Sequence, residues 1–220
     1  VSSSCTVGRW PRTSSNSAAA RPDMSLADVL RRRRMTRRFA GEVPVDWVVE
    51  QCDLARRAPS AGYAQGTHFL VLSDDSLARF WSVSGAGSWF EGRHPGVLGA
   101  SVVVLVLADR SAYESRYSET DKAGHGLETA EGWSVPYWLT DAAMAAQNLL
   151  LLVEEARLGA LFFGLFVEAR RTLRAFDVPD HVECVGAVAI GRRAVDDATS
   201  GTGARRSRRP FDEVAHLGSW

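Results

Sequence analysis

The stretch RRRRMTRRFA, residues 31–40, places six arginines within eight positions and then an apolar phenylalanine. Guanidinium groups donate paired hydrogen bonds that match the oxygens of phosphate and carboxylate. RRSRRP at 205–210 is the other comparable concentration of positive charge, and the two segments together hold ten of the 26 basic residues. If the fold brings 33–37 beside 205–208, they form a cradle for one phosphate group. The alternative is two separately solvated basic patches.

The chain as a whole is not basic, because its 26 Lys and Arg residues are matched by 26 Asp and Glu residues. Proteins that hold a nucleic-acid backbone generally need a net basic face, since neutralising phosphates supplies much of their affinity. No recognisable reading helix or aromatic platform accompanies the arginines. A nucleic-acid-binding module is therefore the weaker alternative, and we expect no nucleic-acid partner.

The side chains form no catalytic motif by themselves. GAGSWF at 85–90 lacks the third glycine of a dinucleotide fingerprint, and Ser60 lies outside a GxSxG elbow. The five histidines have no metal-ligand spacing and the three cysteines no CxxC pattern, so we expect no metal and no disulfide framework. The carboxylate pairs are interpreted as solvated surface pairs; they are Asp74-Asp75, Glu154-Glu155 and Asp196-Asp197. If the protein is an enzyme, a cofactor is expected to carry the chemistry.

The elements that must position these residues mix helical and strand patterns. Helices are predicted from Ser25 onward, over 45–58, over 136–159 and over 167–176. Strands are predicted over 68–73, 97–109, 160–166 and 181–191. This order of elements indicates an α+β fold.

The segment 136–159 gives the strongest helical pattern. It is apolar nearly all the way round, with Pro136 suited to the first turn and Gly159 as the predicted stop. Such a helix must be buried on several sides, by the domain core and by a second subunit.

Composition also predicts the extent and setting of the folded part. Residues 1–23 are rich in Ser, Ala and Arg and are expected to be a disordered extension, with one domain over 24–220. The longest apolar run, at 97–108, is shorter than the roughly 18 residues of a membrane helix, and the N-terminal segment has no apolar signal region. We therefore expect a cytoplasmic protein with no membrane partner.

Four segments, in order along the chain, resemble the FMN-dependent nitroreductase family. The first two are RRMTRRF at 33–39, similar to R-[RH]-S-x-[RK]-x-F, and APSAGYAQGTHFLVL at 58–72, similar to APS-[SA]-x-N-x-QPW-x-F-x-V. The third, DAAMAAQNLLLLVEEARLGALFFG at 141–164, resembles the family's central helix and following strand and is the most specific. The fourth, RSRRP at 206–210 with Arg205 before it, resembles the late K-x-R-x-P phosphate motif.

The resemblance implies a three-layer α+β sandwich with a central, mostly antiparallel sheet flanked by helices. It also implies a homodimer whose long central helices pack together, with FMN at the subunit interface. The residues implied at the FMN phosphate are Arg33, Arg34, Arg206 and Arg208, with Met35 beside them. Arg37 would reach the pyrimidine edge of the flavin, where a fixed cation stabilises the charge that appears on reduction. Further contacts are implied from Pro59, Ser60, Ala61, Tyr63 and Gln65, and the lining of the isoalloxazine from Leu161, Phe162, Phe163 and Gly164.

Three departures from the family pattern concern this site. Met35 stands where the motif has serine, which removes one hydroxyl from the phosphate site. Tyr63 stands in place of asparagine, and Gly66-Thr67 in place of Pro-Trp. Phosphate binding is expected to be preserved, whereas the family's usual substrates do not carry over.

The implied reaction is ping-pong: NAD(P)H passes hydride to flavin N5 and leaves, and a small organic acceptor such as a nitroaromatic or quinone then takes its place. The polar segment 113–134 is expected to be a loop that covers the acceptor pocket. The candidate substrate contacts in it are Tyr113, Arg116, Tyr117 and Lys122. Two alternatives keep the fold: a deazaflavin or another electron donor, and a flavin-binding protein without turnover.

Overall fold

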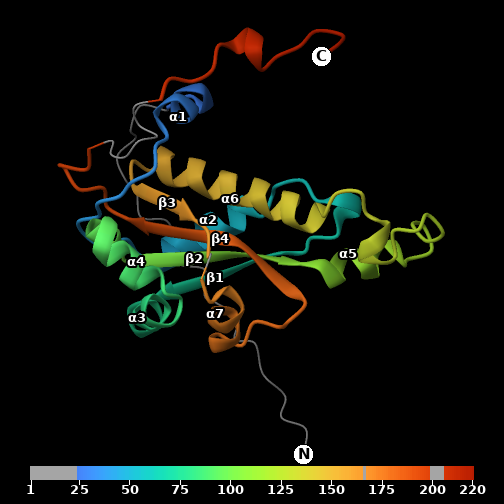
Figure 1. Cartoon of the computed structure of the whole chain (residues 1–220), viewed down its shortest axis with the longest axis horizontal. Coiled ribbons are helices and arrows are strands. Elements are labelled where there is room, and N and C mark those ends of the chain that lie inside the picture. The colour runs from blue at the N-terminus through green and yellow to red at the C-terminus, as the bar shows by residue number, and fades with distance from the viewer. Residues whose placement is uncertain (1–23, 166, 199–205) are drawn as a thin grey trace, which may run out of the picture.

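The structure, a computed structural model, describes residues 24–165, 167–198 and 206–220. Its centre is a four-stranded sheet in the order β1-β2-β4-β3, in which every neighbouring pair is antiparallel (Figure 1). The strands are β1 (Thr67–Ser73), β2 (Val102–Asp109), β3 (Gly159–Phe163) and β4 (Val182–Gly191). β3 is an outer strand of this sheet, and its outer edge contributes to the site described below.

Both faces of the sheet are covered, because β2 alternates between two hydrophobic layers. Its residues 102, 104 and 106 pack with α2 (Val45–Ala55) and α6 (Tyr137–Glu155), whereas residues 103, 105 and 107 belong to the cluster on the opposite face. The helices of that opposite face are α3 (Asp74–Val83), α4 (Ala86–Arg93) and α7 (Ala169–Ala175) (Figure 1). The predicted α+β architecture of helices, sheet and helices is confirmed.

α6 is the long helix that the sequence predicts, but it ends differently. The chain leaves the helix through Arg157, whose φ is 58°, and Leu158 N donates to Val153 O at 3.0 Å. Gly159, the predicted stop, is instead the first residue of β3. A Cβ there would lie 2.8 Å from Thr36 Cγ2, so this glycine permits the close approach of another segment.

Two sequence-based predictions of secondary structure are wrong, and two helices were not predicted. α3 and α4, which fill the connection between β1 and β2, were missed, although Leu77, Phe80 and Trp81 of α3 have helical spacing. The strand predicted from residue 97 begins at 102, because Pro95–Gly99 forms a 3₁₀ turn that buries Val97. The polar loop predicted from residue 113 is helical at first, as α5 (Arg110–Tyr117), whose N-cap Asp109 accepts a hydrogen bond from Ser111 N at 2.8 Å.

Some sequence-based predictions lie outside the described residues. These are the extension over 1–23 and the segment 199–205 with Arg205, and Phe166 is also outside. Within the described ranges, no helix is long and apolar enough to cross a membrane. The same ranges contain no cluster of three or more His, Cys, Asp or Glu side chains placed to bind a metal ion.

Cys52 in α2 and Cys184 in β4 are expected to be unreactive thiols in the native protein. Burial raises the pKa of Cys52 to about 12 and that of Cys184 to about 11. At pH 8 no more than about one thiol in a thousand is ionised at either position. Because the thiolate is the nucleophile, both cysteines should react slowly. In a Cys5→Ser variant treated with iodoacetamide, mass spectrometry should find no labelled cysteine in native protein and two after unfolding in urea. Rapid labelling of native protein would contradict the burial of these thiols.

Candidate functional site

Residues 33–38 run from the end of α1 (Leu26–Arg32) along the outer edge of β3. Thr36 N donates to Ala160 O at 2.8 Å, and Phe39 forms an antiparallel bridge with Arg193. α1 begins after Ser25, as predicted, and the Ser25 hydroxyl accepts from the N–H of the third helical residue at 3.2 Å. The arginines of this segment are therefore carried past the end of the sheet at fixed positions.

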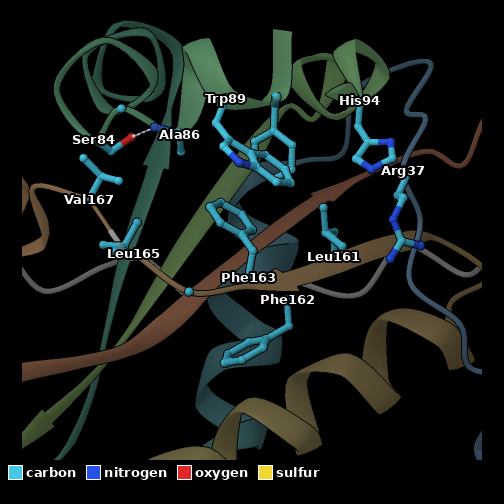
Figure 2. A pocket seen from close by; sticks show the side chains of 13 residues that line it. Arg37, Ser84, Ala86, Trp89, His94, Leu161, Phe162, Phe163, Leu165 and Val167 are labelled. Carbon is cyan, nitrogen blue, oxygen red and sulfur yellow. Dashed lines mark hydrogen bonds between the residues drawn. The ribbon is translucent and has the colours of Figure 1, made fainter. Parts of the chain in front are cut away.

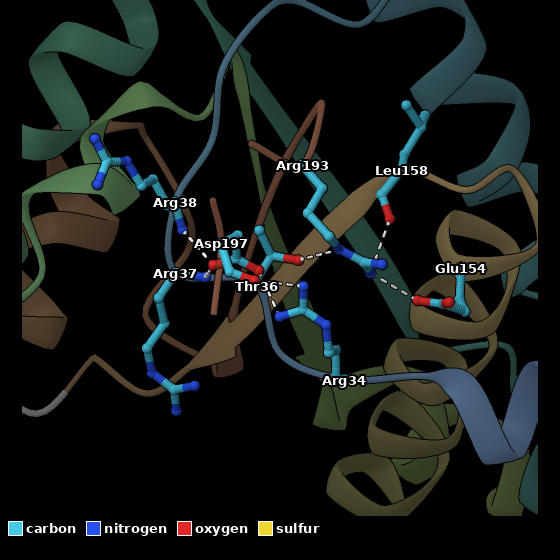
Figure 3. A network of polar contacts seen from close by, with 8 residues as sticks. All are labelled: Arg34, Thr36, Arg37, Arg38, Glu154, Leu158, Arg193 and Asp197. Carbon is cyan, nitrogen blue, oxygen red and sulfur yellow. Dashed lines mark hydrogen bonds and ion pairs between the residues drawn. The ribbon is translucent and has the colours of Figure 1, made fainter. Parts of the chain in front are cut away.

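Asp197 is the acceptor around which this segment is arranged (Figure 3). Its carboxylate accepts the backbone N–H groups of Arg37 and Arg38 at 3.0 Å each. Arg34 Nη1 donates to the same carboxylate at 2.5 Å, and Arg34 Nη2 donates to Asp197 O at 2.7 Å. The Asp197 side chain is 2% exposed, so these donors replace water around its charge.

These contacts correct one prediction and give the position of a second predicted residue. Asp197 is a buried structural carboxylate and not part of a solvated pair; its neighbour Asp196 is exposed and pairs with Arg38 at 3.1 Å. Arg34, which the family resemblance places at a phosphate, uses its two terminal nitrogens to bind Asp197.

A second buried ion pair fixes the segment from the side of α6 (Figure 3). Glu154, whose side chain is 4% exposed, accepts from Arg193 Nη2 at 2.8 Å. The same guanidinium donates through Nε to Thr36 Oγ1 at 3.1 Å and through Nη2 to Leu158 O at 3.3 Å. The interpretation of Glu154 as a surface residue is therefore wrong, because it joins α6 to the arginine segment.

Two of the six arginines, Arg33 and Arg37, make no side-chain hydrogen bond or ion pair within the described residues, whereas the other four each have at least one such contact. Arg33 Nη1 is buried and has no hydrogen-bond partner in the described part of the chain. The Arg37 guanidinium has neither a hydrogen bond nor an ion pair to any residue within 24–165, 167–198 or 206–220. A buried N–H donor without an acceptor lowers the stability of the folded protein. An anion that accepts a hydrogen bond from Arg33 Nη1 would therefore stabilise this segment.

Arg37 also lines a pocket of about 310 Å³ (Figure 2). One wall is formed by the end of β3 and the residues after it, and the other by α4 and the residues on either side of it. The lining of the first wall includes Leu161, Phe162, Phe163 and Gly164, and that of the second includes Trp89, Phe90 and His94. Phe163 packs edge-on against Phe90 with ring centroids 5.1 Å apart. The pocket is thus mainly apolar, with a guanidinium and an imidazole at one end.

The pocket gathers one part of the predicted site and adds residues that the sequence did not indicate. The four predicted β3 residues and Arg37 line it together. Trp89, Phe90 and His94 were not predicted, because GAGSWF resembles only an incomplete dinucleotide fingerprint. The available signal was an aromatic pair followed within four residues by the basic pair Arg93-His94.

The other predicted flavin contacts, in the segment 59–65, lie at the opposite end of α6. Ala61 N donates to Asp141 Oδ2 at 2.8 Å near the start of the helix, whereas the Arg193 contact is to Glu154 near its end. Positions 141 and 154 are 13 residues apart, which is roughly 20 Å along a helix axis. Within one copy, the segment 59–65 and the Arg193–Glu154 pair therefore lie near opposite ends of α6.

Tyr113 supports the segment 59–65 from inside the protein. It is wholly buried, and its hydroxyl donates to Asp141 Oδ2 at 2.8 Å and lies 3.5 Å from Ser60 Oγ. Burial raises the pKa of Tyr113 well above its usual value, so it stays a neutral donor. The prediction that Tyr113 contacts an acceptor is wrong, since its whole side chain lies in the core.

The other candidate acceptor contacts lie nearer the surface. Arg116 Nε donates to Gly62 O at 2.8 Å, and its two terminal nitrogens bind Asp121 at 2.7 and 2.8 Å. The Tyr117 ring is 4.7 Å from that of Trp133, and Lys122 Nζ is 5.9 Å from the Tyr117 centroid.

Met35 and the late arginines differ in how they are placed. The Met35 sulfur accepts the Phe162 N–H at 3.4 Å, and its side chain packs on both hydrophobic layers, so it does not replace the missing serine hydroxyl. Arg206 and Arg208 are exposed, and neither is among the residues that line the two pockets beside Arg37. The cradle between the two arginine segments stays a prediction.

Comparison with known proteins gives consistent likenesses. The model of the nitroreductase family matches residues 30–192. A protein of Methanothermobacter thermautotrophicus, named as an NADH dehydrogenase/NAD(P)H nitroreductase, is 27% identical over 205 residues, which cover 90% of this chain and 88% of that protein. The solved nitroreductase CinD from Lactococcus lactis, in complex with chloramphenicol, has a TM-score of 0.68 at 16% identity over 89% of this chain and 100% of that one. A nitroreductase from Desulfovibrio desulfuricans, in complex with FMN, has a TM-score of 0.64 at 24% identity over 92% of this chain and 99% of that one.

Proposed function

The chain belongs to the nitroreductase family, and we propose that it is an FMN-dependent oxidoreductase that takes hydride from NAD(P)H and reduces a small organic acceptor. The observation that carries the proposal is the pocket of Figure 2 with the unpaired Arg37 guanidinium at its polar end. The names of the relatives, and the FMN complex among the structures of the same fold, agree with this proposal.

The residues present fit an FMN molecule in two respects. The buried Arg33 Nη1 without a partner matches the need of a phosphate oxygen for a charged donor. The walls formed by β3 and α4 match a planar aromatic ring, and Gly164 leaves room for its close approach. Arg206 and Arg208 are proposed to complete the phosphate site, whereas Arg34 is assigned to Asp197.

When bound, FMN supplies the redox chemistry, accepting a hydride and passing electrons to a second substrate. The protein's part is to place charge and exclude water. Arg37, and His94 beside it, put positive charge or hydrogen-bond donors at the polar end of the pocket. No described side chain is needed as a nucleophile, and protons for the acceptor are proposed to come from solvent.

We also propose that the working form is a homodimer in which the segment 59–65 of one copy completes the pocket of the other. Within one copy, the α6 residues that contact the segment 59–65 and Arg193 are roughly 20 Å apart along the helix. Large apolar side chains remain exposed on α1, α2 and α6; they are Leu26, Leu30, Val49, Leu54, Tyr137 and Met144. The segment 206–220 lies at the periphery of the ribbon (Figure 1). Its Phe211, Leu217 and Trp220 are exposed, as expected of an arm that packs on a second copy.

The proposal is tested first by the visible absorption of the purified protein after incubation with FMN, followed by anaerobic addition of NADPH. Flavin absorbance that stays with the protein and bleaches supports both the cofactor and the hydride transfer. Bound flavin that does not bleach points to another electron donor or to a flavin-binding protein without turnover. Absence of flavin binding would overturn the proposal.

Arg37→Met is expected to weaken FMN binding by roughly ten- to a hundredfold, because a charged hydrogen bond in a water-poor pocket is lost. It should also make the flavin midpoint potential more negative, since less charge opposes that of the reduced ring. Arg38→Met is the matched control, because Arg38 is exposed and pairs with Asp196; its FMN affinity should stay within about twofold of wild type. Equal losses in both variants, by fluorescence titration with FMN, would contradict a specific role for Arg37.

A further inference from the structure

Three of the four residues in the segment 62–65 have a positive φ, which side chains other than glycine rarely adopt. Gly62 and Tyr63 both have a φ of 59°, and Gln65 has a φ of 55°. Left-handed backbone costs little for glycine, is tolerated by asparagine, and is unfavourable for a bulky aromatic residue. Tyr63 and Gln65 are therefore both strained, and Tyr63 is the bulkier of the two.

The strain persists because the surrounding residues fix the turn from several sides. Asp141, 3% exposed in α6, accepts Ala61 N at 2.8 Å, and Ser60 Oγ accepts Gln65 N at 2.8 Å. From the other side Arg116 Nε donates to Gly62 O at 2.8 Å. These contacts involve the backbone of the turn, so they hold whichever side chain occupies position 63.

Packing leaves the turn no alternative path. A Cβ on Gly62 would lie 2.7 Å from Tyr117 Cε2, and one on Gly66 would lie 2.6 Å from Asp109 O. Positions 62 and 66, one before Tyr63 and three after it, therefore require glycine. Tyr63, with the same φ as Gly62, does not follow this rule, and the family motif that the segment resembles has asparagine at its position.

The Tyr63 side chain adds little to the stability of the fold. It is 75% exposed, and its ring has no aromatic contact or side-chain hydrogen bond to any residue that the structure describes. Asparagine or glycine would relieve the strain and expose less apolar surface. Tyr63 lowers stability through backbone strain and through exposed apolar surface, and it stabilises no contact among the described residues. Such a residue points to a ligand outside the chain.

The surroundings of the turn indicate what that ligand is. Gly62 lies against the Tyr117 ring, whose centroid is 4.7 Å from that of Trp133, and Trp133 is 5.6 Å from Tyr137. Tyr117 and Trp133 are half-buried and Tyr137 is exposed, so aromatic side chains are accessible next to Tyr63. Flat aromatic molecules bind to such groups through ring stacking.

We propose that Tyr63 is a specificity-determining residue that selects planar aromatic acceptors by stacking on them. This inference rests on the proposed function, in which the segment 59–65 of one copy faces the flavin pocket of the other. It explains why an unfavourable side chain occupies a position suited to asparagine: the stacking surface is gained at a cost in stability.

The test compares Tyr63→Asn with Tyr63→Phe and wild type, all as the FMN-loaded full chain. The probe is benzoate, an aromatic molecule that accepts no hydride, and its dissociation constant is read from the change in flavin absorbance. Tyr63→Asn is expected to raise this constant by roughly three- to tenfold and to raise the Tm by about 2–4 °C. Tyr63→Phe, which keeps both the ring and the strain, should bind benzoate as tightly as wild type and should not raise the Tm.

Each other outcome is decisive. A more stable Tyr63→Asn variant with unchanged benzoate affinity would overturn the inference alone and leave the proposed function standing. A lower Tm for Tyr63→Asn would mean that the ring supports the fold or the subunit contact, and would overturn it too. Failure of the wild type to bind FMN would overturn the proposed function, and this inference with it.

Discussion

Replacing Asp197 with alanine is expected to lower the free energy of unfolding by about 2–4 kcal/mol and to release most of the bound FMN. The carboxylate is 2% exposed and receives two backbone N–H groups and one guanidinium. Removal leaves these donors without an acceptor in a region that water reaches poorly. The Arg34 guanidinium is 30% exposed and can recover some hydration, which keeps the expected loss below that of a fully enclosed pair.

The effect on FMN follows from the position of the lost contacts. Asp197 binds the N–H groups of Arg37 and Arg38 and therefore sets the path of the backbone from which the Arg37 side chain reaches the pocket. Without it the segment loses its fixed geometry, and the guanidinium must be ordered at the moment of binding. Small displacements of a positioning group have large effects on ligand affinity.

The neighbouring carboxylate supplies the control for this prediction. Asp196 is 63% exposed and pairs with Arg38 on the surface, so Asp196→Ala should change the free energy of unfolding by less than about 0.5 kcal/mol. Urea unfolding of both FMN-free variants separates the stability effect from the loss of ligand. Equal effects of the two substitutions would show that Asp197 is not the centre of the segment.

This contrast shows what the sequence does not contain. Asp196-Asp197 and Glu154-Glu155 are pairs of equal appearance, and nothing local distinguishes the buried member of each. The distinction comes from partners distant in the chain: Arg34 is 163 positions from Asp197, and Arg193 is 39 positions from Glu154. Hydrophobic period and turn chemistry report on neighbours within a few residues, so such pairings are not visible to them.

Long apolar elements were predictable because their signal lies within a short stretch of the chain. β2 buries nearly all its side chains and α6 buries nine of 19 residues, so the apolar composition of both elements indicated burial, and the sheet around β2 followed. α3 and α4 were missed, and α4, with two glycines in eight residues, has only Gly87 and Phe90 buried. Since Trp89 and Phe90 of α4 line the pocket, the least regular helix was also one of the most important for the site.

The candidate site was predictable in its parts but not in its arrangement. The four family-like segments correctly indicated the family, and Arg37 and the β3 residues do meet in one pocket. The segment 59–65 lies elsewhere in the same copy, which a list of motifs along one chain does not reveal. The positions of these contacts along α6 are the basis for our proposal that a second copy unites them.

The buried pair Arg193–Glu154 is expected to give the other large effect, and the effect should depend on whether one partner or both are removed. Arg193→Met leaves Glu154, 4% exposed, without its close cation, since Arg32 Nε is 4.0 Å away and exposed. We expect a loss of about 3–5 kcal/mol in the free energy of unfolding. Glu154→Leu should cost less, because Arg193 is 21% exposed and keeps its contacts to Thr36 Oγ1 and Leu158 O.

The double variant Arg193→Met/Glu154→Leu should be more stable than Arg193→Met alone, by roughly 1–3 kcal/mol, because no charge is then left buried without a partner. Urea unfolding of the four proteins closes the cycle, and a double loss equal to the sum of the single losses would contradict direct coupling. FMN affinity should not recover with stability. The Arg193 guanidinium also holds Thr36, next to Arg37, so both variants that lack it should bind FMN more weakly than Glu154→Leu does. The Arg193–Glu154 pair would then mainly fix the arginine segment beside the pocket. Its net contribution to the free energy of unfolding would be small, and a large loss would occur only when one partner is removed alone.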